Sequence, residues 1–151
     1  MGQMGPLPER IRNYLEAHHV LTLATVDEGG PWAVSLFYAS DGAMNLYVLS
    51  DPATRHGRAM AHGARVAVTV YDETREWTSI RGIQLWGTAE EVTAAERVFA
   101  RYTEKFPFAR ALIPSEGPHR FYGITPRWIR LIDSSQGLGF KEELWLERGA
   151  R

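Results

Sequence analysis

The sequence contains no cysteine, which excludes disulfide bonds, thiolate metal sites and cysteine nucleophiles. It also lacks any apolar run close to the roughly 20 residues that a membrane-spanning helix requires. Met1 to Pro8 hold no apolar core of a signal peptide. The formal net charge is only −1, without a basic stripe or a basic helix. We therefore expect a cytoplasmic protein with no nucleic-acid partner and no membrane surface.

Familiar catalytic motifs are missing as well. No Gly-x-Ser-x-Gly elbow, Walker loop or Rossmann glycine motif occurs, and the spacing of the five histidines fits no zinc site. The adjacent pair His18 and His19 cannot face one side of regular structure, so no metal site is predicted. If the protein is an enzyme, its reactive group is expected to be a bound cofactor.

What the chain does contain is the ordinary composition of a globular protein, with 44% hydrophobic and 23% charged residues. Its 151 residues fit one domain, residues 1–151, with room for a substantial core. Tryptophan is frequent for this length and stands at five positions: Trp32, Trp77, Trp86, Trp128 and Trp145. So many tryptophans indicate either a large core or an aromatic contact surface.

Alternating apolar residues separated by turn sequences predict a mainly β protein. Strands are expected at residues 20–26, 32–38, 44–49, 66–72, 79–89 and 128–133. The first three are joined by short turns, which only antiparallel neighbours allow. Gly82 and Gly87 lie inside a long strand, where glycine marks a bulge or bend of the kind that a closing barrel needs. We predict an antiparallel β-barrel of about six strands with helices packed around it.

Three helices are predicted around this barrel, at residues 7–18, 51–63 and 93–106. In the second helix, Asp51 is the expected N-cap and Pro52 the first helical residue. In the third, Thr93 and Glu96 match a capping box.

The first candidate binding segment runs from Ser50 to His56, where the third strand meets the second helix. Ser50 and Thr54 offer hydroxyls, and the helix N-terminus offers unpaired backbone amides. Arg55 and His56 are potential cations, and arginine suits a phosphate because its planar fork bonds two oxygens at once. Asp51 would repel an anion there, and an ordinary capped helix with a solvated Arg55 stays open as the alternative.

The second candidate segment lies within the long strand that contains the glycines. Gly82, Gln84 and Trp86 alternate along it and therefore share one face. A glycine beside an amide and a flat ring can receive a planar ligand that also needs hydrogen bonds. The alternative is a bend of the barrel with Gln84 on the surface.

Several of these fragments, taken in order, resemble the pyridoxamine-phosphate-oxidase-like family of split-barrel proteins that bind flavin mononucleotide (FMN). They are Val-Leu-Thr-Leu-Ala-Thr at 20–25, Ser50 with Thr54-Arg55-His56, and Arg81-Gly82 with Gly87-Thr-Ala-Glu. The similarity runs from about His18 to Trp145, and it is greatest to a small, poorly characterised bacterial subgroup. It implies a split β-barrel and a homodimer with FMN sites between the protomers.

The resemblance also implies which residues hold the cofactor. One set lies along the isoalloxazine edge, mainly through its backbone: Val34, Ser35, Leu36 and Phe37. A second set holds the phosphate: Ser50, Thr54, Arg55 and His56. The second protomer contributes the strand that contains Gln84, together with C-terminal residues.

Two departures from the family pattern reduce the charge expected at the phosphate. The strand at 34–39 carries no Arg or Lys, and His56 stands where many members have Lys. Arg55 is then the one permanent cation of the predicted phosphate pocket. The substrate-binding residues of true pyridoxamine phosphate oxidases are not recognisable, so that activity is not predicted.

The function that the resemblance implies is an FMN-dependent oxidoreductase, in which the flavin accepts a hydride from a small-molecule substrate or electron donor. The alternative is a non-enzymatic carrier or sensor of a flavin, a haem or another planar anionic ligand. A structural dimer without a cofactor is the third possibility.

Overall fold

Residues 5–113 and 118–147 are described in the computed structural model of the chain. Seven strands make up most of this part: β1 (Val20–Asp27), β2 (Gly30–Ser40), β3 (Leu46–Ser50), β4 (Ala64–Tyr71), β5 (Arg81–Glu91), β6 (Arg120–Asp133) and β7 (Lys141–Trp145). Four α-helices accompany them: α1 (Leu7–Ala17), α2 (Arg55–Met60), α3 (Ala95–Lys105) and α4 (Ala109–Leu112). Short 3₁₀ helices lie at Trp77–Ser79 and Ser134–Gln136. None of the described helices has the length and apolar character needed to cross a bilayer.

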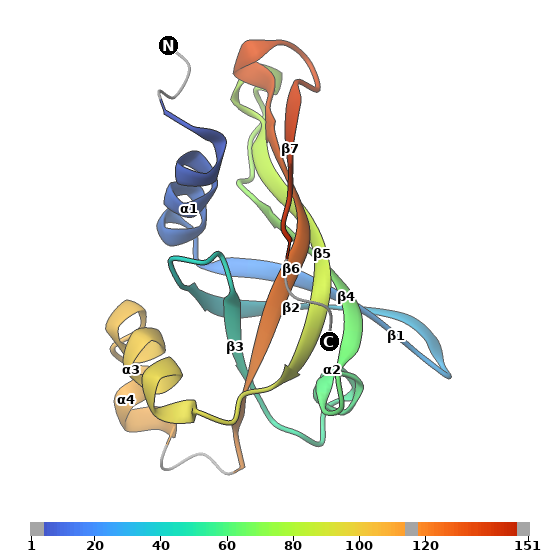
Figure 1. Ribbon diagram of the computed structural model, residues 1–151, viewed down its shortest axis with the longest axis vertical. Coiled ribbons are helices and arrows are strands. Elements are labelled where there is room, and N and C mark those ends of the chain that lie inside the picture. Colours follow the sequence, from blue (N-terminus) through green and yellow to red (C-terminus); the bar gives the residue numbers. More distant parts are fainter. Residues whose placement is uncertain (1–4, 114–117, 148–151) are drawn as a thin grey trace.

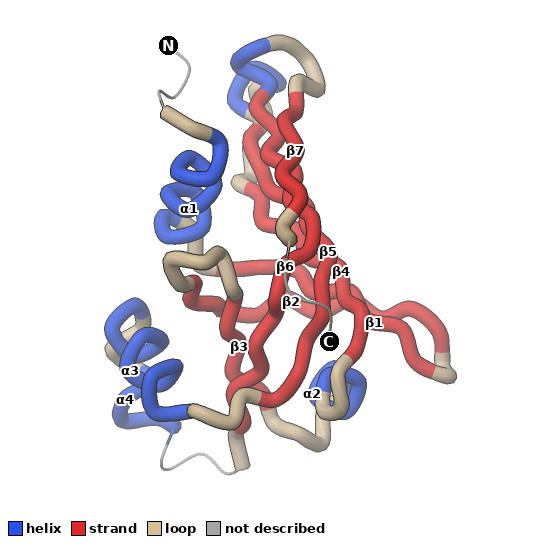
Figure 2. Tube along the Cα trace, in the orientation of Figure 1, coloured by secondary structure: helices blue, strands red, loops and turns tan. Residues whose placement is uncertain are grey.

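The strands form one antiparallel sheet in the order β3-β2-β1-β4-β5-β6-β7, and β3 also pairs with β6. This second pairing closes six strands into a barrel, while β7 extends the sheet beyond β6 (Figure 2). The prediction of a mainly β, antiparallel split barrel with helices around it is therefore confirmed.

The barrel splits where the β1–β2 hairpin leaves the sheet. β1 pairs with β2 along its whole length but with β4 only from Thr22 to Ala24. The tip of the hairpin therefore projects beyond the barrel, on the right of Figure 1. β2 pairs with β3 only from Tyr38 to Ser40, so most of its second edge has no strand beside it in the described part of the chain. This open edge positions the candidate site.

Alternation along the strands sends every second side chain into the barrel. Leu21 and Leu23 of β1 are fully buried there, and α1 closes one end of the barrel with Ile11 and Leu15. Burying a leucine or isoleucine side chain contributes about 1.5–3 kcal/mol. A second apolar cluster forms outside the barrel, where α3 and α4 pack on β6: Ala39, Val98, Tyr102, Phe106, Ala109 and Phe121.

Two predicted helix starts are wrong. α2 begins at Arg55, and its N-cap is Thr54, whose Oγ1 accepts the amide of Gly57 at 3.1 Å. Asp51 instead accepts the amide of Ala53 at 2.8 Å, which stabilises the turn before the helix. α3 begins at Ala95 with Ala94 as its N-cap and without any side-chain cap, and the Val92 amide before it still donates to the carbonyl of Phe121 in the sheet.

The last part of the sheet is more extensive than predicted. β6 begins at Arg120 rather than at 128, and β7 and α4 were not predicted. A bulge follows Trp86, where the register of β5 on β6 shifts. A Cβ at Gly87 would lie 2.1 Å from the carbonyl oxygen of Thr125, so only glycine permits this approach. The predicted bend at Gly87 is thus confirmed as a bulge.

Candidate functional site

The open edge of β2 offers backbone groups to a ligand. The Tyr38 amide donates to the carbonyl of His19 at 3.0 Å. Antiparallel pairing alternates along a strand, so the amides and carbonyls of Ala33 and Ser35 point away from β1. No strand of residues 5–113 and 118–147 pairs with them on that side. The strand therefore presents unpaired donors and acceptors in a fixed array.

The residues predicted along the isoalloxazine edge all lie on this strand: Val34, Ser35, Leu36 and Phe37. Val34 and Leu36 pack partly against the barrel core. Ser35 and Phe37 are exposed on the outer face of the sheet, and the Oγ atoms of Ser35 and Thr22 lie 3.4 Å apart. Their backbone, more than their side chains, is thus what a ligand at this edge would meet.

Three of the four residues predicted to hold a phosphate meet at the end of β3. Ser50 Oγ lies 2.5 Å from His56 Nε2, and Thr54 Oγ1 lies 3.3 Å from each of these atoms. Ser50 and His56 are each only 7% exposed. Burial lowers the pKa of His56 below its ordinary value, so its imidazole is neutral at pH 7. The cluster therefore offers two hydroxyls, of which that of Thr54 already donates to the Asp51 carbonyl at 2.7 Å, and a neutral ring, but no charge.

Arg55, the fourth predicted phosphate residue, contacts the tip of the β1–β2 hairpin. Its Nε and Nη2 donate to the two carboxylate oxygens of Asp27 at 2.8 and 2.9 Å, and Nη2 also lies 3.3 Å from the Gly30 carbonyl. The guanidinium carbon lies 4.5 Å from the centre of the Trp32 ring. The hydrogen bonds between the two side chains lower the pKa of Asp27 and raise that of Arg55. Sequence reasoning missed Asp27, because 28 residues separate it from Arg55 and no local pattern links them.

The outer face of the sheet carries two rows of side chains, which the register of the strands defines. The outer apolar row crosses from β2 to β7: Ala33, Ala24, Ala67, Trp86, Trp128 and Trp145. The outer polar row lies beside it: Ser35, Thr22, Thr69, Gln84, Arg130 and Glu143. The apolar row is therefore flat at its β2 end, where its side chains are alanines, and bulky at its β7 end, where they are tryptophans. None of the five tryptophans is buried, and Trp145 is 67% exposed, so the aromatic surplus lies on the surface.

Gln84 lies in the outer polar row, three strands away from Ser35. At the usual spacing of strands the distance between them is about 14 Å. Arg130 Nη1 donates to Gln84 Oε1 at 3.4 Å, while Arg130 Nη2 donates to Glu143 at 2.6 Å. Within one chain Gln84 is therefore not brought together with the other predicted site residues, and its contribution from a second protomer stays a prediction.

The interpretation of Gly82 as an open platform for a ligand is wrong. A Cβ at Gly82 would lie 2.4 Å from the ring of Tyr71, which is its cross-strand neighbour on β4. The ring of Tyr71 thus fills the space that the missing side chain leaves.

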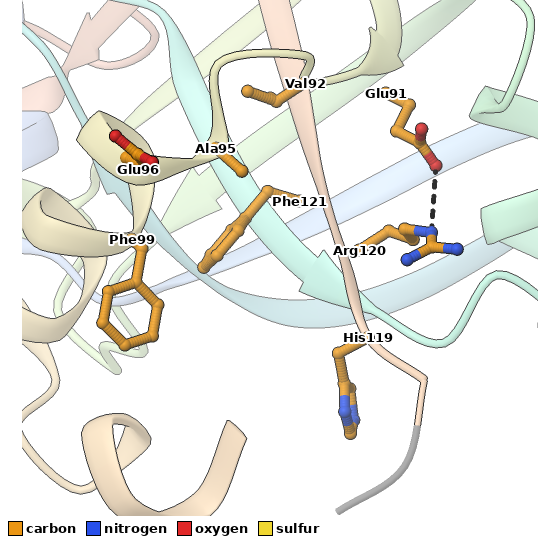
Figure 3. Close-up of a pocket in the computed structure, with 8 residues that line it drawn as sticks. All are labelled: Glu91, Val92, Ala95, Glu96, Phe99, His119, Arg120 and Phe121. Carbon is orange, nitrogen blue, oxygen red and sulfur yellow. Dashed lines mark ion pairs between the residues drawn. The ribbon is translucent and has the colours of Figure 1, made fainter. Parts of the chain in front are cut away.

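Several cavities of the described residues, two of which are mainly apolar, lie away from the predicted residues. One, of about 490 Å³, lies between α3 and β6. Figure 3 shows Phe99 and Phe121 on one side of it and Arg120 on the other, with Arg120 Nε 3.4 Å from a carboxylate oxygen of Glu91. The second, of about 370 Å³, lies where β1 separates from β4, beside Ala67 and Trp86. Neither is lined by a residue predicted to bind a cofactor.

An antiparallel split barrel with an open strand edge beside a buried polar cluster defines a class of small split-barrel proteins. A sequence profile of the pyridoxamine 5'-phosphate oxidase family matches residues 7–133, and the chain belongs to this family. A UPF0306 protein of Klebsiella pneumoniae is 32% identical over 143 residues, which cover 93% of this chain and 94% of the relative. The poorly characterised bacterial subgroup that the sequence resembles is therefore this UPF0306 group.

Two solved structures share the fold. A haem-binding protein from Mycobacterium smegmatis superposes with a TM-score of 0.74 at 21% identity, covering 95% of this chain and 60% of that one. A FAD-binding protein from Mesorhizobium loti gives a TM-score of 0.64 at 23% identity, covering 80% and 88%. At these identities the likeness establishes the fold alone.

Proposed function

We propose that the protein binds FMN along the open edge of β2 and acts as a flavin-dependent oxidoreductase on a small-molecule substrate or electron donor. The observation that carries the proposal is the edge itself, where Ala33 and Ser35 direct unpaired backbone groups outward. A flavin ring has hydrogen-bonding atoms along its rim and apolar faces, which suits such an edge. Membership of the family and the FAD-binding protein of the same fold support this assignment.

The polar groups at the end of β3 would hold the phosphate of FMN. Ser50 and Thr54 offer hydroxyls, and Arg55 joins this cluster to the start of β2 through its contacts with Gly30 and Trp32. Nη1 of Arg55 makes no hydrogen bond within the described residues and is available to a phosphate oxygen. The bound isoalloxazine would supply hydride and electron transfer, while the chain would orient it and exclude water.

A homodimer with the ligand site on its seam is the second part of the proposal. A two-fold interface uses one surface patch twice, so that patch must be complementary to itself. The outer apolar row meets this condition in part, because an axis along the strands between β1 and β4 would set Trp86 of each copy on Ala33 of the other and Ala24 on Ala67. The same axis would bring Gln84 of the partner subunit over Ser35, which joins the separated site residues.

Flavin titration of the purified protein tests the proposal. We expect quenching of FMN fluorescence that saturates at one flavin for each chain, and flavin reduction when a nicotinamide donor is added. Binding without turnover would favour the carrier or sensor over the enzyme. Failure to bind FMN at micromolar concentrations would contradict the proposed function.

A separate observation favours haem as a second candidate ligand. His19 is exposed at the start of β1, its imidazole has no hydrogen bond within the described residues, and its ring lies 5.9 Å from that of Phe106. Phe106 in turn lies 5.1 Å from Phe37 and 6.0 Å from Phe108, so this imidazole lies at the edge of an aromatic cluster. A planar iron porphyrin would suit such a surface, and the M. smegmatis haem-binding protein has the same fold.

Haemin titration tests this alternative with a matched pair of variants. A Soret band that shifts on binding and is lost in His19→Ala, but kept in the exposed control His62→Ala, would support haem. A Soret band that is the same in both variants would contradict ligation by His19.

A further inference from the structure

The carboxylate of Asp27 forms an ion pair with Arg55, the cation on which phosphate binding would depend. The Asp27 carboxylate accepts hydrogen bonds from both Nε and Nη2 of Arg55, at 2.8 and 2.9 Å, so the pair is bidentate. The same carboxylate accepts the Gly29 amide at 2.8 Å, which holds it at the hairpin tip. The two side chains are 33% and 27% exposed, so the pair is only partly hydrated.

The backbone at the hairpin tip lies in close contact with Arg55. A Cβ at Gly29 would lie 2.7 Å from Arg55 Nη2, so the turn passes directly beside the guanidinium. The ring of Trp32 covers the guanidinium at 4.5 Å. Arg55 is thus fixed at the hairpin by Asp27, Gly29 and Trp32 together, with only Nη1 left for a ligand.

The charges around the predicted phosphate pocket add up to no positive excess. Arg55 is balanced by Asp27, and His56 is neutral because it is buried. Arg58, which donates to the Ala53 carbonyl at 2.6 Å and helps to lower the pKa of Asp27, adds one positive charge, and the Asp51 carboxylate of the same turn adds one negative charge. A phosphate dianion would therefore meet hydrogen-bond donors here but little net attraction.

We propose that Asp27 is a specificity-determining residue that neutralises Arg55, so that the site takes flavins with little preference for the phosphorylated form. This inference rests on the proposed function, because it concerns the same site. FMN gains a directional contact with Nη1, but the repulsion between its phosphate and Asp27 offsets most of that gain. Riboflavin, which has no phosphate, loses nothing.

The test compares Asp27→Asn with Glu28→Gln in fluorescence titrations of FMN and riboflavin. Asparagine keeps an oxygen for the Gly29 amide and Arg55 Nη2, removes the charge, and replaces the acceptor of Arg55 Nε by an amide nitrogen. Glu28 is exposed in the same turn, so its glutamine variant removes an equal charge without touching Arg55. We expect Asp27→Asn to raise the affinity for FMN about three- to ten-fold and that for riboflavin by about two-fold or less. Glu28→Gln is expected to change neither by more than about two-fold.

A double variant shows whether Asp27 acts through Arg55. In the Arg55→Ala background, Asp27→Asn is expected to give no gain for FMN, because the cation that it releases is absent. An equal gain in that background, or an equal gain from Glu28→Gln, would overturn the inference. So would an unchanged ratio of FMN to riboflavin affinity in Asp27→Asn.

The unsubstituted protein supplies a measurement that does not depend on the folding of any variant. If Asp27 neutralises Arg55, its FMN affinity changes by about two-fold or less as salt rises from low to physiological concentration. A steep loss of FMN affinity with salt would overturn the inference while leaving flavin binding in place. If neither flavin binds at all, the proposed function fails and the inference fails with it.

Discussion

Lys105, the last residue of α3, is a partly buried amine that fastens α1 to the barrel. Its Nζ donates to the carbonyl of Leu15 at 3.3 Å and to that of His18, and it lies 4.3 Å from the centre of the Tyr38 ring. The carbonyls at the end of a helix lack intrahelical partners, so this amine satisfies groups that the helix leaves open. Burial lowers the pKa of Lys105 from its ordinary value of 10.5 to about 8.

This burial predicts a stability that rises with pH. Between about pH 8 and pH 10.5 the unfolded chain keeps the Lys105 proton while the folded chain releases it. Lys105 therefore makes the free energy of unfolding increase with pH in this window. Lys105→Met has no such proton, so the difference in unfolding free energy between the two proteins should grow in favour of Lys105 as pH rises. Denaturant unfolding across the window measures it, and a constant difference would contradict the pKa.

Two substitutions at Ser35 can distinguish the role of the backbone from that of the side chain at the open edge. The Ser35 amide points away from β1, and proline is tolerated on an edge strand where the missing amide faces solvent. We expect Ser35→Pro to weaken flavin binding about ten-fold by removing one donor, and Ser35→Ala to change it by about two-fold or less. Circular dichroism checks that both variants keep the fold. Equal losses in both would show that the hydroxyl, not the strand edge, binds the ligand.

At the scale of elements, the junction of β5 and β6 depends on one glycine. A side chain at position 87 would collide with the backbone of Thr125 and Pro126, which cannot move without separating the strands. Gly87→Ala is expected to destabilise the protein by about 1–3 kcal/mol, the usual cost of overpacking. Gly42 is the control, because a Cβ there meets nothing within 4 Å. Thermal unfolding compares the two, and equal melting temperatures would contradict the close approach at Gly87.

The strands could be predicted from the sequence because their signal is local. In β4, the buried Val66, Val68 and Val70 alternate with the outward-facing Arg65, Ala67 and Thr69, and the pleat converts that alternation into an inner and an outer face. β7 was not predicted because Lys141–Trp145 is mostly charged and lacks an alternating apolar pattern; it only extends an existing sheet. The pair Asp51-Pro52 has the pattern of a helix N-cap and first helical residue, but the Asp51 side chain accepts the Ala53 amide in a turn that precedes the helix.

The candidate site was predictable only as far as its residues are close in sequence. Ser50, Thr54 and His56 meet because a strand end and a helix start bring them together within a few residues. The partner of Arg55 could not be inferred, because Asp27 reaches it only through the twist and projection of the β1–β2 hairpin. This one long-range contact changes the expected electrostatics of the site from cationic to neutral.

At the scale of the whole molecule, the outer face of the sheet is the surface that we propose as the dimer interface. Trp145 is 67% exposed and Val26 is 73% exposed on this face, beside the cavity of about 370 Å³ at Ala67 and Trp86. An exposed aromatic surface of this kind indicates an interface. The small alanines at the other end of the same row would leave room for Trp86 of a second copy in the proposed dimer.

A charge on the flat half of the outer apolar row should therefore dissociate the dimer without unfolding the chain. Ala24 is exposed at the centre of that half, so Ala24→Arg leaves the barrel core untouched while placing an unpaired cation in the proposed interface. Ala100, exposed on α3, is the matched control, because the same substitution there lies away from the sheet face. We expect light scattering to show a dimer for the unsubstituted protein and for Ala100→Arg, and a monomer for Ala24→Arg at micromolar concentration. If the site lies on the seam, Ala24→Arg should also weaken flavin binding, although it lies outside the phosphate cluster. A dimer that survives Ala24→Arg would show that the two copies meet through another face, and a monomeric unsubstituted protein would refute the dimer itself.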